Sequence, residues 1–186
     1  MSYPSRDEAL AVLEEHTQGE SLRKHAYAVE AAMRFYAARL GEDAERWGVV
    51  GLLHDFDYER YPSLDDHPFK GAEILRAKGY DADLIDAILS HADHTGVPRD
   101  TPVRKTLFAV DELCGFVTAV TLVRPSKKIE EVEPSSVKKK LKDKAFARNV
   151  SREDIAAGAE LLGIPLDEHI RNVITAMRGI SDELGL

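Results

Sequence analysis

Histidine and aspartate residues stand in this sequence where hydrophobic residues are expected. His25 lies within an amphipathic helical pattern, the pair His54–Asp55 ends an apolar run, and Asp111 and His91 lie in otherwise apolar helical segments. A carboxylate in such surroundings is strongly unfavourable unless it is paired. Because no Lys or Arg stands at helical spacing from Asp111, its partner must come from elsewhere in the chain.

A divalent metal ion would satisfy these buried groups together. The four ligands expected from this reasoning are His25, His54, Asp55 and Asp111. Imidazole combined with carboxylate suits Mn²⁺, Fe²⁺, Co²⁺, Ni²⁺ or Zn²⁺ better than Ca²⁺. Adjacent side chains are about 100° apart on a helix. His54 and Asp55 therefore reach one ion only if the helix ends there, which the polar residues after Asp57 favour.

The apolar periodicity that positions these residues is helical along the whole chain. Helices are expected over 6–16, 22–40, 44–54, 68–78, 81–92, 103–123, 135–148, 151–162 and 166–184. Residues 55–68 are polar and predict a loop, while 129–132 fits either a short strand or irregular structure. With no βαβ alternation and no internal repeat, the fold class expected is all-α, with residues 1–186 forming a single domain.

Composition narrows the class of protein. The 186 residues carry 25 Lys and Arg against 33 Asp and Glu, a net charge of −8, which argues against binding a nucleic-acid polymer. The single cysteine excludes an internal disulfide and suits the cytoplasm. The first residues lack the pattern of a signal peptide. The longest apolar stretch, 107–123, contains two acidic residues and is too short to span a membrane, so no membrane partner is expected.

Three motifs in order resemble the H…HD…D signature of the HD-domain superfamily of metal-dependent phosphohydrolases. They are Ser-Leu-Arg-Lys-His25, Gly-Leu-Leu-His54-Asp55 and Ala-Val-Asp111-Glu-Leu. The segment His67-Pro-Phe-Lys-Gly-Ala-Glu-Ile-Leu is similar to the H-P-x-x-G-A-x-x-L segment of members that bind two metals, and Ile-Leu-Ser-His91 is similar to their next one. The resemblance covers about residues 20–125.

The resemblance implies an HD-domain helical bundle, with its core at about 20–125 and a C-terminal helical extension at about 126–186. It implies that His25, His54, Asp55 and Asp111 hold a first ion, and that His67 and His91 hold a second one bridged by Asp55. A role for His67 as a helix cap competes with metal binding. His94 stands where a double histidine is usual, so it is expected to be displaced, and the number of ions, one or two, stays open.

The activity implied is hydrolysis of a phosphate ester of a small metabolite, expected to be a nucleotide, by metal-activated water. Asp57 or Glu59 would orient the water or protonate the leaving group. The cations expected to bind phosphate oxygens are Arg23, Lys24, Lys70, Arg124 and Lys127. The basic residues between 127 and 148 are otherwise interpreted as a solvated helix face.

Two other functions remain open from the sequence. One is a non-catalytic, metal-stabilised helical module that binds a nucleotide or a partner protein, since the loop after Asp55 departs from the family pattern. The other is an HD-type oxygenase with a mixed-valent di-iron site, which needs six ligands. The sequence leaves the substrate, the native metal, the oligomeric state and the role of the last sixty residues undetermined.

Overall fold

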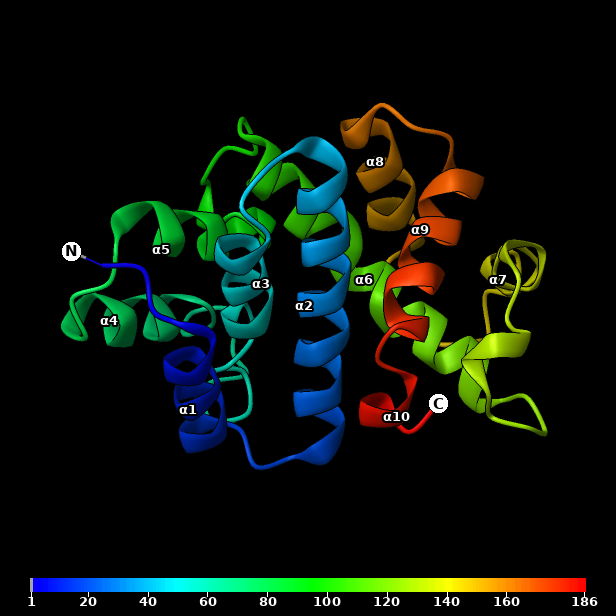
Figure 1. Cartoon of the computed structure of the whole chain (residues 1–186), viewed down its shortest axis with the longest axis horizontal. Coiled ribbons are helices and arrows are strands. Elements are labelled where there is room, and N and C mark those ends of the chain that lie inside the picture. The colour runs from blue at the N-terminus through cyan, green and yellow to red at the C-terminus, as the bar shows by residue number, and fades with distance from the viewer. Residues whose placement is uncertain (1) are drawn as a thin grey trace.

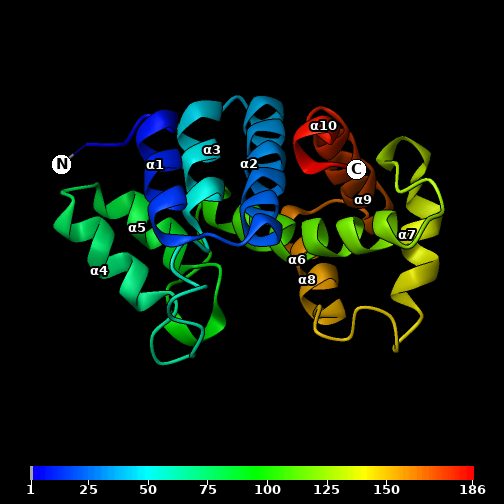
Figure 2. The ribbon, with the colours of Figure 1, turned by 90° about the horizontal axis from the view of Figure 1, so that it is seen from below.

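Helix α2 (Glu20–Leu40) is the element around which the other helices are arranged in this computed structural model, which describes residues 2–186. Helix α3 (Ala44–Leu53) runs alongside α2, and α1 (Arg6–His16) packs on the far side of α3. Figure 2 shows these three helices side by side, with α6 (Pro102–Leu122) crossing them. Each of these elements agrees with a predicted helix to within a few residues.

The remaining elements flank this centre on two sides. On one side lie α4 (Phe69–Ala77) and α5 (Ala82–Leu89), followed by a 3₁₀ turn, Asp93–Thr95. On the other lie a 3₁₀ turn (Ile129–Glu131), α7 (Pro134–Leu141), α8 (Arg152–Leu162), α9 (Leu166–Arg178) and α10 (Ser181–Leu184). Residues 2–186 contain one isolated bridge, Ser2 with Tyr80, and no strand. The fold is all-α, as predicted.

Helix ends follow the capping chemistry of the sequence. Ser5 begins α1 with a capping box, in which its hydroxyl accepts from the Glu8 amide while the Glu8 carboxylate accepts from the Ser5 amide. Asp43 caps α3 by accepting from two backbone amides. Gly41 ends α2 in the left-handed conformation, at a φ of 74°, which glycine adopts without steric cost.

Three predicted helices are shorter than expected. The helix predicted over 81–92 ends at Leu89, so His91 lies in the turn that follows α5. The helix predicted over 135–148 ends at Leu141, because the Arg152 guanidinium binds the carbonyls of Ala147 and Val150 at 2.6 and 2.7 Å and holds that segment in an irregular course. The helix predicted over 166–184 is divided into α9 and α10 at Gly179. Apolar periodicity does not reveal the bonds from Arg152, which directly follows the irregular segment.

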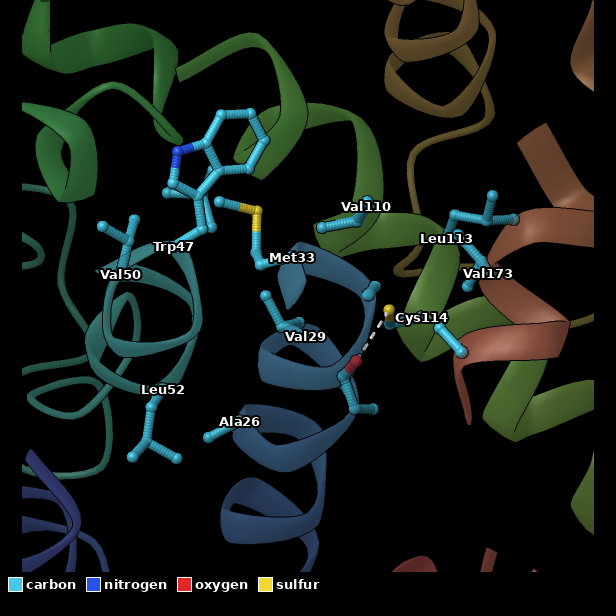
Figure 3. Packing of buried hydrophobic residues seen from close by; sticks show 14 of the residues in the cluster. Ala26, Val29, Met33, Trp47, Val50, Leu52, Val110, Leu113, Cys114 and Val173 are labelled. Carbon is cyan, nitrogen blue, oxygen red and sulfur yellow. Dashed lines mark hydrogen bonds between the residues drawn. The ribbon is translucent and has the colours of Figure 1, made fainter. Parts of the chain in front are cut away.

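The contact between α2 and α3 forms the centre of the hydrophobic core (Figure 3). Val29 and Met33 of α2 face Trp47 of α3, and these three residues and Val50 of α3 are buried. The helices approach closely because Gly51 of α3 lies against α2, where a Cβ would stand 3.0 Å from backbone atoms of Glu30. This approach carries the end of α3 to the side of α2.

A second side of α2 packs against α6 and α9. Val110 and Leu113 of α6 and Val173 of α9 are fully buried there, and the Cys114 thiol donates to the carbonyl of Ala28 at 3.6 Å (Figure 3). Burial raises the pKa of the Cys114 thiol well above its ordinary value, so it packs as a small apolar group. In the part of the chain that the structure describes, no helix is long and apolar enough to cross a membrane.

Helices α6 and α8 are held together by a close backbone contact at Gly158. A Cβ at this position would stand 2.6 Å from the Cα of Ala109, so Gly158→Ala should lower the free energy of unfolding by about 1–3 kcal/mol through overpacking. Urea denaturation measures the change. Gly115→Ala is the matched control, since its Cβ would meet nothing within 4 Å and should stabilise α6 by about 0.5–1 kcal/mol. Equal stability of the two variants would contradict the close contact.

Candidate metal centre

The fold brings together four side chains that the sequence scatters over 87 positions. The Nε2 atom of His25 lies 3.0 Å from Oδ1 of Asp111, and Nε2 of His54 lies 3.5 Å from both Oδ1 of Asp111 and Oδ2 of Asp55. One ligand atom from each of the four residues lies within 4.8 Å of the others. Helix α2 supplies His25, the end of α3 supplies the pair, and α6 supplies Asp111.

His54 and Asp55 face the same point because α3 ends just before them. The helix ends at Leu53, with His54 as its C-cap, and the chain continues into a turn in which the Tyr58 amide donates to the carbonyl of Asp55. The Nδ1 atom of His54 donates to the carbonyl of Gly51 at 2.7 Å, which turns Nε2 toward the carboxylates. The helix end expected from the sequence is therefore present.

A second group of ligand atoms adjoins the first through Asp55. Its Oδ1 atom lies 3.2 Å from Nε2 of His67 and 3.4 Å from Nε2 of His91, and the two nitrogens are 3.2 Å apart. The other oxygen of Asp55, Oδ2, faces His54. Asp55 thus presents one oxygen to each group, which is the arrangement of a carboxylate that bridges two ions.

Each of these histidines is fixed by a bond on the far side of its ring. Nδ1 of His91 lies 2.6 Å from the carbonyl of Ile88, and Nδ1 of His67 lies 2.8 Å from Oδ1 of Asp57. A hydrogen donated from Nδ1 leaves the lone pair of the neutral ring on Nε2, as in histidines that bind metal. With His54, three rings are oriented in this way.

Asp57 faces His67 rather than open solvent. It is 1% exposed, and its second oxygen accepts from the backbone amide of Gly71 at 2.7 Å. Glu59, the other acid expected to take part in proton transfer, accepts from the backbone amides of Gln18 and Gly19 just before α2. The structure brings Asp57 to the back of the cluster and does not bring Glu59 to it.

A cavity of about 500 Å³, here named the cluster cavity, opens beside the two groups of ligands. Besides His25, Asp55, His67, His91 and Asp111, it is lined by Tyr58, Leu64, Ala92, Asp93, His94, Phe108, Glu112, Gly115, Val150 and Asp154. Val150 and Asp154 belong to the last sixty residues, so this part of the chain completes the wall. Their place depends on tertiary packing, and no local signal in the sequence indicates it.

None of the five cations expected to bind phosphate lines the cluster cavity. Arg23 bonds the carbonyl of Thr17 at 2.6 Å and so holds the α1–α2 connection. Lys70 and Arg124 pair with acidic neighbours, and Lys127 lies in the turn after α6. Lys24 pairs with Glu20 and lines a different cavity. Sequence proximity to a ligand does not fix the direction of a long side chain.

The three histidines outside the two groups of ligand atoms form hydrogen bonds with other parts of the chain. Nε2 of His94 lies 2.9 Å from the carbonyl of His67, so it is displaced from the ligand atoms as expected. His16 and His169 are buried, and His169 is bonded at both ring nitrogens, to the Tyr36 hydroxyl and to the carbonyl of Ala109. These three imidazoles join parts of the fold.

Mutual attraction between the charges dominates the electrostatics of the cluster. Burial by itself would lower the pKa of His54, but the charges of Asp55 and Asp111 raise it well above its ordinary value. Burial would raise the pKa of both aspartates, and the nearby imidazoles lower it well below their usual range instead. Burial would also lower the pKa of His67, but its hydrogen bonds with Asp55 and Asp57 raise this pKa to about 9.

Glu112 follows Asp111 on α6 and also lines the cluster cavity. Burial and the neighbouring charge of Asp111 raise its pKa to about 7. Its carboxylate accepts from the backbone amide of Ser151 at 3.2 Å, which ties α6 to the start of α8.

The donor set fits a divalent ion. Nε2 of His54 is buried and has no hydrogen-bond partner, although oxygens of Asp55 and Asp111 face it at 3.5 Å. An unpartnered buried nitrogen beside two carboxylates is costly, and a cation between them would satisfy all three. Imidazole nitrogen with carboxylate oxygen is the ligand chemistry of transition-metal ions.

Comparison with known proteins agrees with this geometry. The chain is 29% identical over 139 residues to ribonuclease Y of Thermotoga petrophila and of Thermotoga maritima, covering 73% of this chain and 27% of theirs. It is 28% identical over 164 residues to ribonuclease Y of Thermosipho melanesiensis, covering 84% of this chain and 30% of the relative. The chain thus spans less than a third of these relatives. No solved structure matches it significantly.

A family profile described as the HD domain matches residues 22–115, which is half of the chain. The matched segment begins just before His25, contains His54 and Asp55, and ends just after Asp111. With the ligand atoms converging as the signature requires, the chain belongs to the HD-domain superfamily of metal-dependent phosphohydrolases.

Proposed function

We propose that this chain hydrolyses a phosphate ester of a small metabolite at one or two divalent ions held by the clustered histidines and aspartates. The observation that carries the proposal is the buried, unpartnered Nε2 of His54, which faces carboxylate oxygens of Asp55 and Asp111. The family supports the coarse activity. The roles of individual residues and the identity of the substrate are part of this proposal.

Two adjoining sites follow from the ligand atoms. His25, His54, Asp55 and Asp111 form the first, and Asp55 with His67 and His91 forms the second. A bound divalent ion lowers the pKa of coordinated water and offsets negative charge on phosphate oxygens. Because no Lys or Arg lines the cluster cavity, the protein's own side chains supply no other fixed cation to the phosphate there.

The surrounding residues prepare the site before substrate arrives. Asp57 and the carbonyls of Gly51 and Ile88 hold three imidazoles with Nε2 toward the centre. Tyr58 and Phe108 add aromatic walls to the cluster cavity, against which the organic part of a substrate can pack. This preorganisation limits the entropy lost when the reacting groups meet.

A small phosphate ester is favoured over RNA, although the relatives carry the name ribonuclease Y. A polyanionic chain is usually bound by several Lys and Arg residues along its path. The cluster cavity instead carries acidic Asp93, Glu112 and Asp154 at its wall. Nucleoside monophosphates, as expected from the sequence, are therefore the first substrates to test, and a short RNA is the second.

A screen with chelation tests the function itself. The chain should hydrolyse phosphomonoesters in the presence of Mn²⁺, Co²⁺ or Ni²⁺, lose activity in EDTA and regain it when metal is restored. Bound metal without turnover of monoesters, diesters or RNA would favour the non-catalytic module. Two bound irons with oxygen consumption would favour the oxygenase, because six ligands are brought together here.

Asp55→Asn should abolish metal binding at both sites, since Asp55 presents an oxygen to each. We expect activity to fall by at least about 100-fold, because even residues that only support ligands change affinity or activity by about 10–100-fold. Metal content by mass spectrometry and initial rates measure the effect. The control, Asp65→Asn, removes the same charge from an exposed loop residue and should retain both properties. A variant at Asp55 that keeps its metal would refute the ligand assignment.

Asp57→Asn should reduce metal binding selectively at the second site. An amide nitrogen beside Nδ1 of His67 would donate to it, which moves the ring proton to Nε2 and removes the lone pair that faces Asp55. Affinity for the second ion should fall by about 10–100-fold, while the first site is retained. Calorimetric titration with Zn²⁺ counts the ions. A wild-type chain that binds a single ion would eliminate the second site.

A further inference from the structure

A second cavity, of about 610 Å³, adjoins the cluster cavity and is here named the apolar cavity. Its lining includes Thr118 and Leu122 of α6 together with Leu184 and Leu186 near the C-terminal end. Figure 1 shows α10 beside the first turns of α2, with α6 passing behind them. The cavity lies where these three elements meet.

The two cavities share a boundary formed by His25 and Gly115, since both residues line both spaces. His25 directs Nε2 toward Asp111 on the cluster side. Gly115 has no side chain, and a Cβ placed there would meet no atom within 4 Å. The boundary is therefore open at Gly115.

The face of α6 that carries the candidate ligand continues into the apolar cavity. Asp111, Gly115, Thr118 and Leu122 are spaced by four, three and four residues, so they follow one another along one face of the helix. An elongated molecule with one end beside Asp111 would pass Gly115 and reach Leu122. A single ligand would then place a polar group beside Asp111 and an apolar group beside Leu122.

Charge in the apolar cavity is balanced. Glu20 and Lys24 are the charged side chains among its ten lining residues, the imidazole of His25 aside, and they pair with each other at 2.7 Å. The pair leaves no excess charge to attract a second phosphate. The lining favours an uncharged, apolar group.

We propose that the apolar cavity binds the apolar organic group of a phosphate ester whose phosphate lies beside the clustered histidines, so that alkyl or aryl phosphates are preferred substrates. This inference rests on the proposed function, and within it favours alkyl or aryl phosphates over the nucleotides expected from the sequence. In this proposal Gly115 determines substrate preference because it leaves the boundary open. Leu122 contributes because it contacts the apolar group.

Alkylphosphonates, which are not hydrolysed, test the inference by binding alone. Calorimetry on the Zn²⁺-loaded chain compares ethylphosphonate with hexylphosphonate. Four additional methylenes withdrawn from water should tighten binding by at least about tenfold. On methyl-labelled protein, NMR signals of Leu122 and Leu184 should shift with hexylphosphonate and not with ethylphosphonate.

Variants of the residues that line the apolar cavity test which positions produce the preference for the longer phosphonate. Gly115→Leu should remove most of the preference for the longer chain, because the new side chain enters the open boundary. Leu122→Ser should reduce the preference by severalfold. Val123→Ser is the matched control, since Val123 is 57% exposed and does not line the cavity, and it should keep the wild-type ratio of dissociation constants.

The outcomes separate this inference from the proposed function. Equal affinity for the two phosphonates, or a preference that persists in Gly115→Leu, would overturn the apolar cavity as a substrate site while the phosphate site stands. Failure of both phosphonates to bind the metal-loaded chain, together with absent hydrolysis, would overturn both. Faster turnover of nucleoside monophosphates than of hexyl phosphate would also contradict the preference proposed here.

Discussion

The attraction between two partly buried carboxylates and the imidazoles around them is the interaction on which the rest of this structure depends. Asp55 and Asp111 would be costly to bury alone, and the fold offers them His25, His54, His67 and His91 within 3.0–3.5 Å. Because these residues come from separate helices and loops, satisfying the carboxylates also fixes how α2, α3 and α6 meet. Site formation and folding are therefore coupled in the same contacts.

The sequence predicted the helices well, and it indicated residues that the structure brings together, because both follow from local pattern. Polar residues within apolar helical patterns indicate His25, Asp111 and the pair at the end of α3. The end of α3 after Leu53 was expected from chain polarity, and the structure has it there. Polar residues that stand in apolar surroundings can be recognised as candidate site residues from the sequence alone.

Long side chains and irregular segments could not be predicted in the same way. Arg23 and Lys70 stand near motif residues in the sequence but point to partners outside the cavity. The segment after Leu141 leaves the helix, and Arg152, which follows it directly, binds the carbonyls of Ala147 and Val150. In each case the partner lies within six residues along the chain, and the direction that the long side chain takes depends on the folded backbone, which spacing along the chain does not specify.

The hydrogen bond from the Ser151 amide to Glu112 links the second half of the chain to the wall of the site. Val150 and Asp154 stand beside it in that wall, whereas the candidate ligands all precede residue 112. One half of the polypeptide thus carries the reactive groups and the other limits the space around them. Divergence in the second half can change which molecules enter while leaving coordination chemistry intact, so selectivity and reactivity can evolve separately.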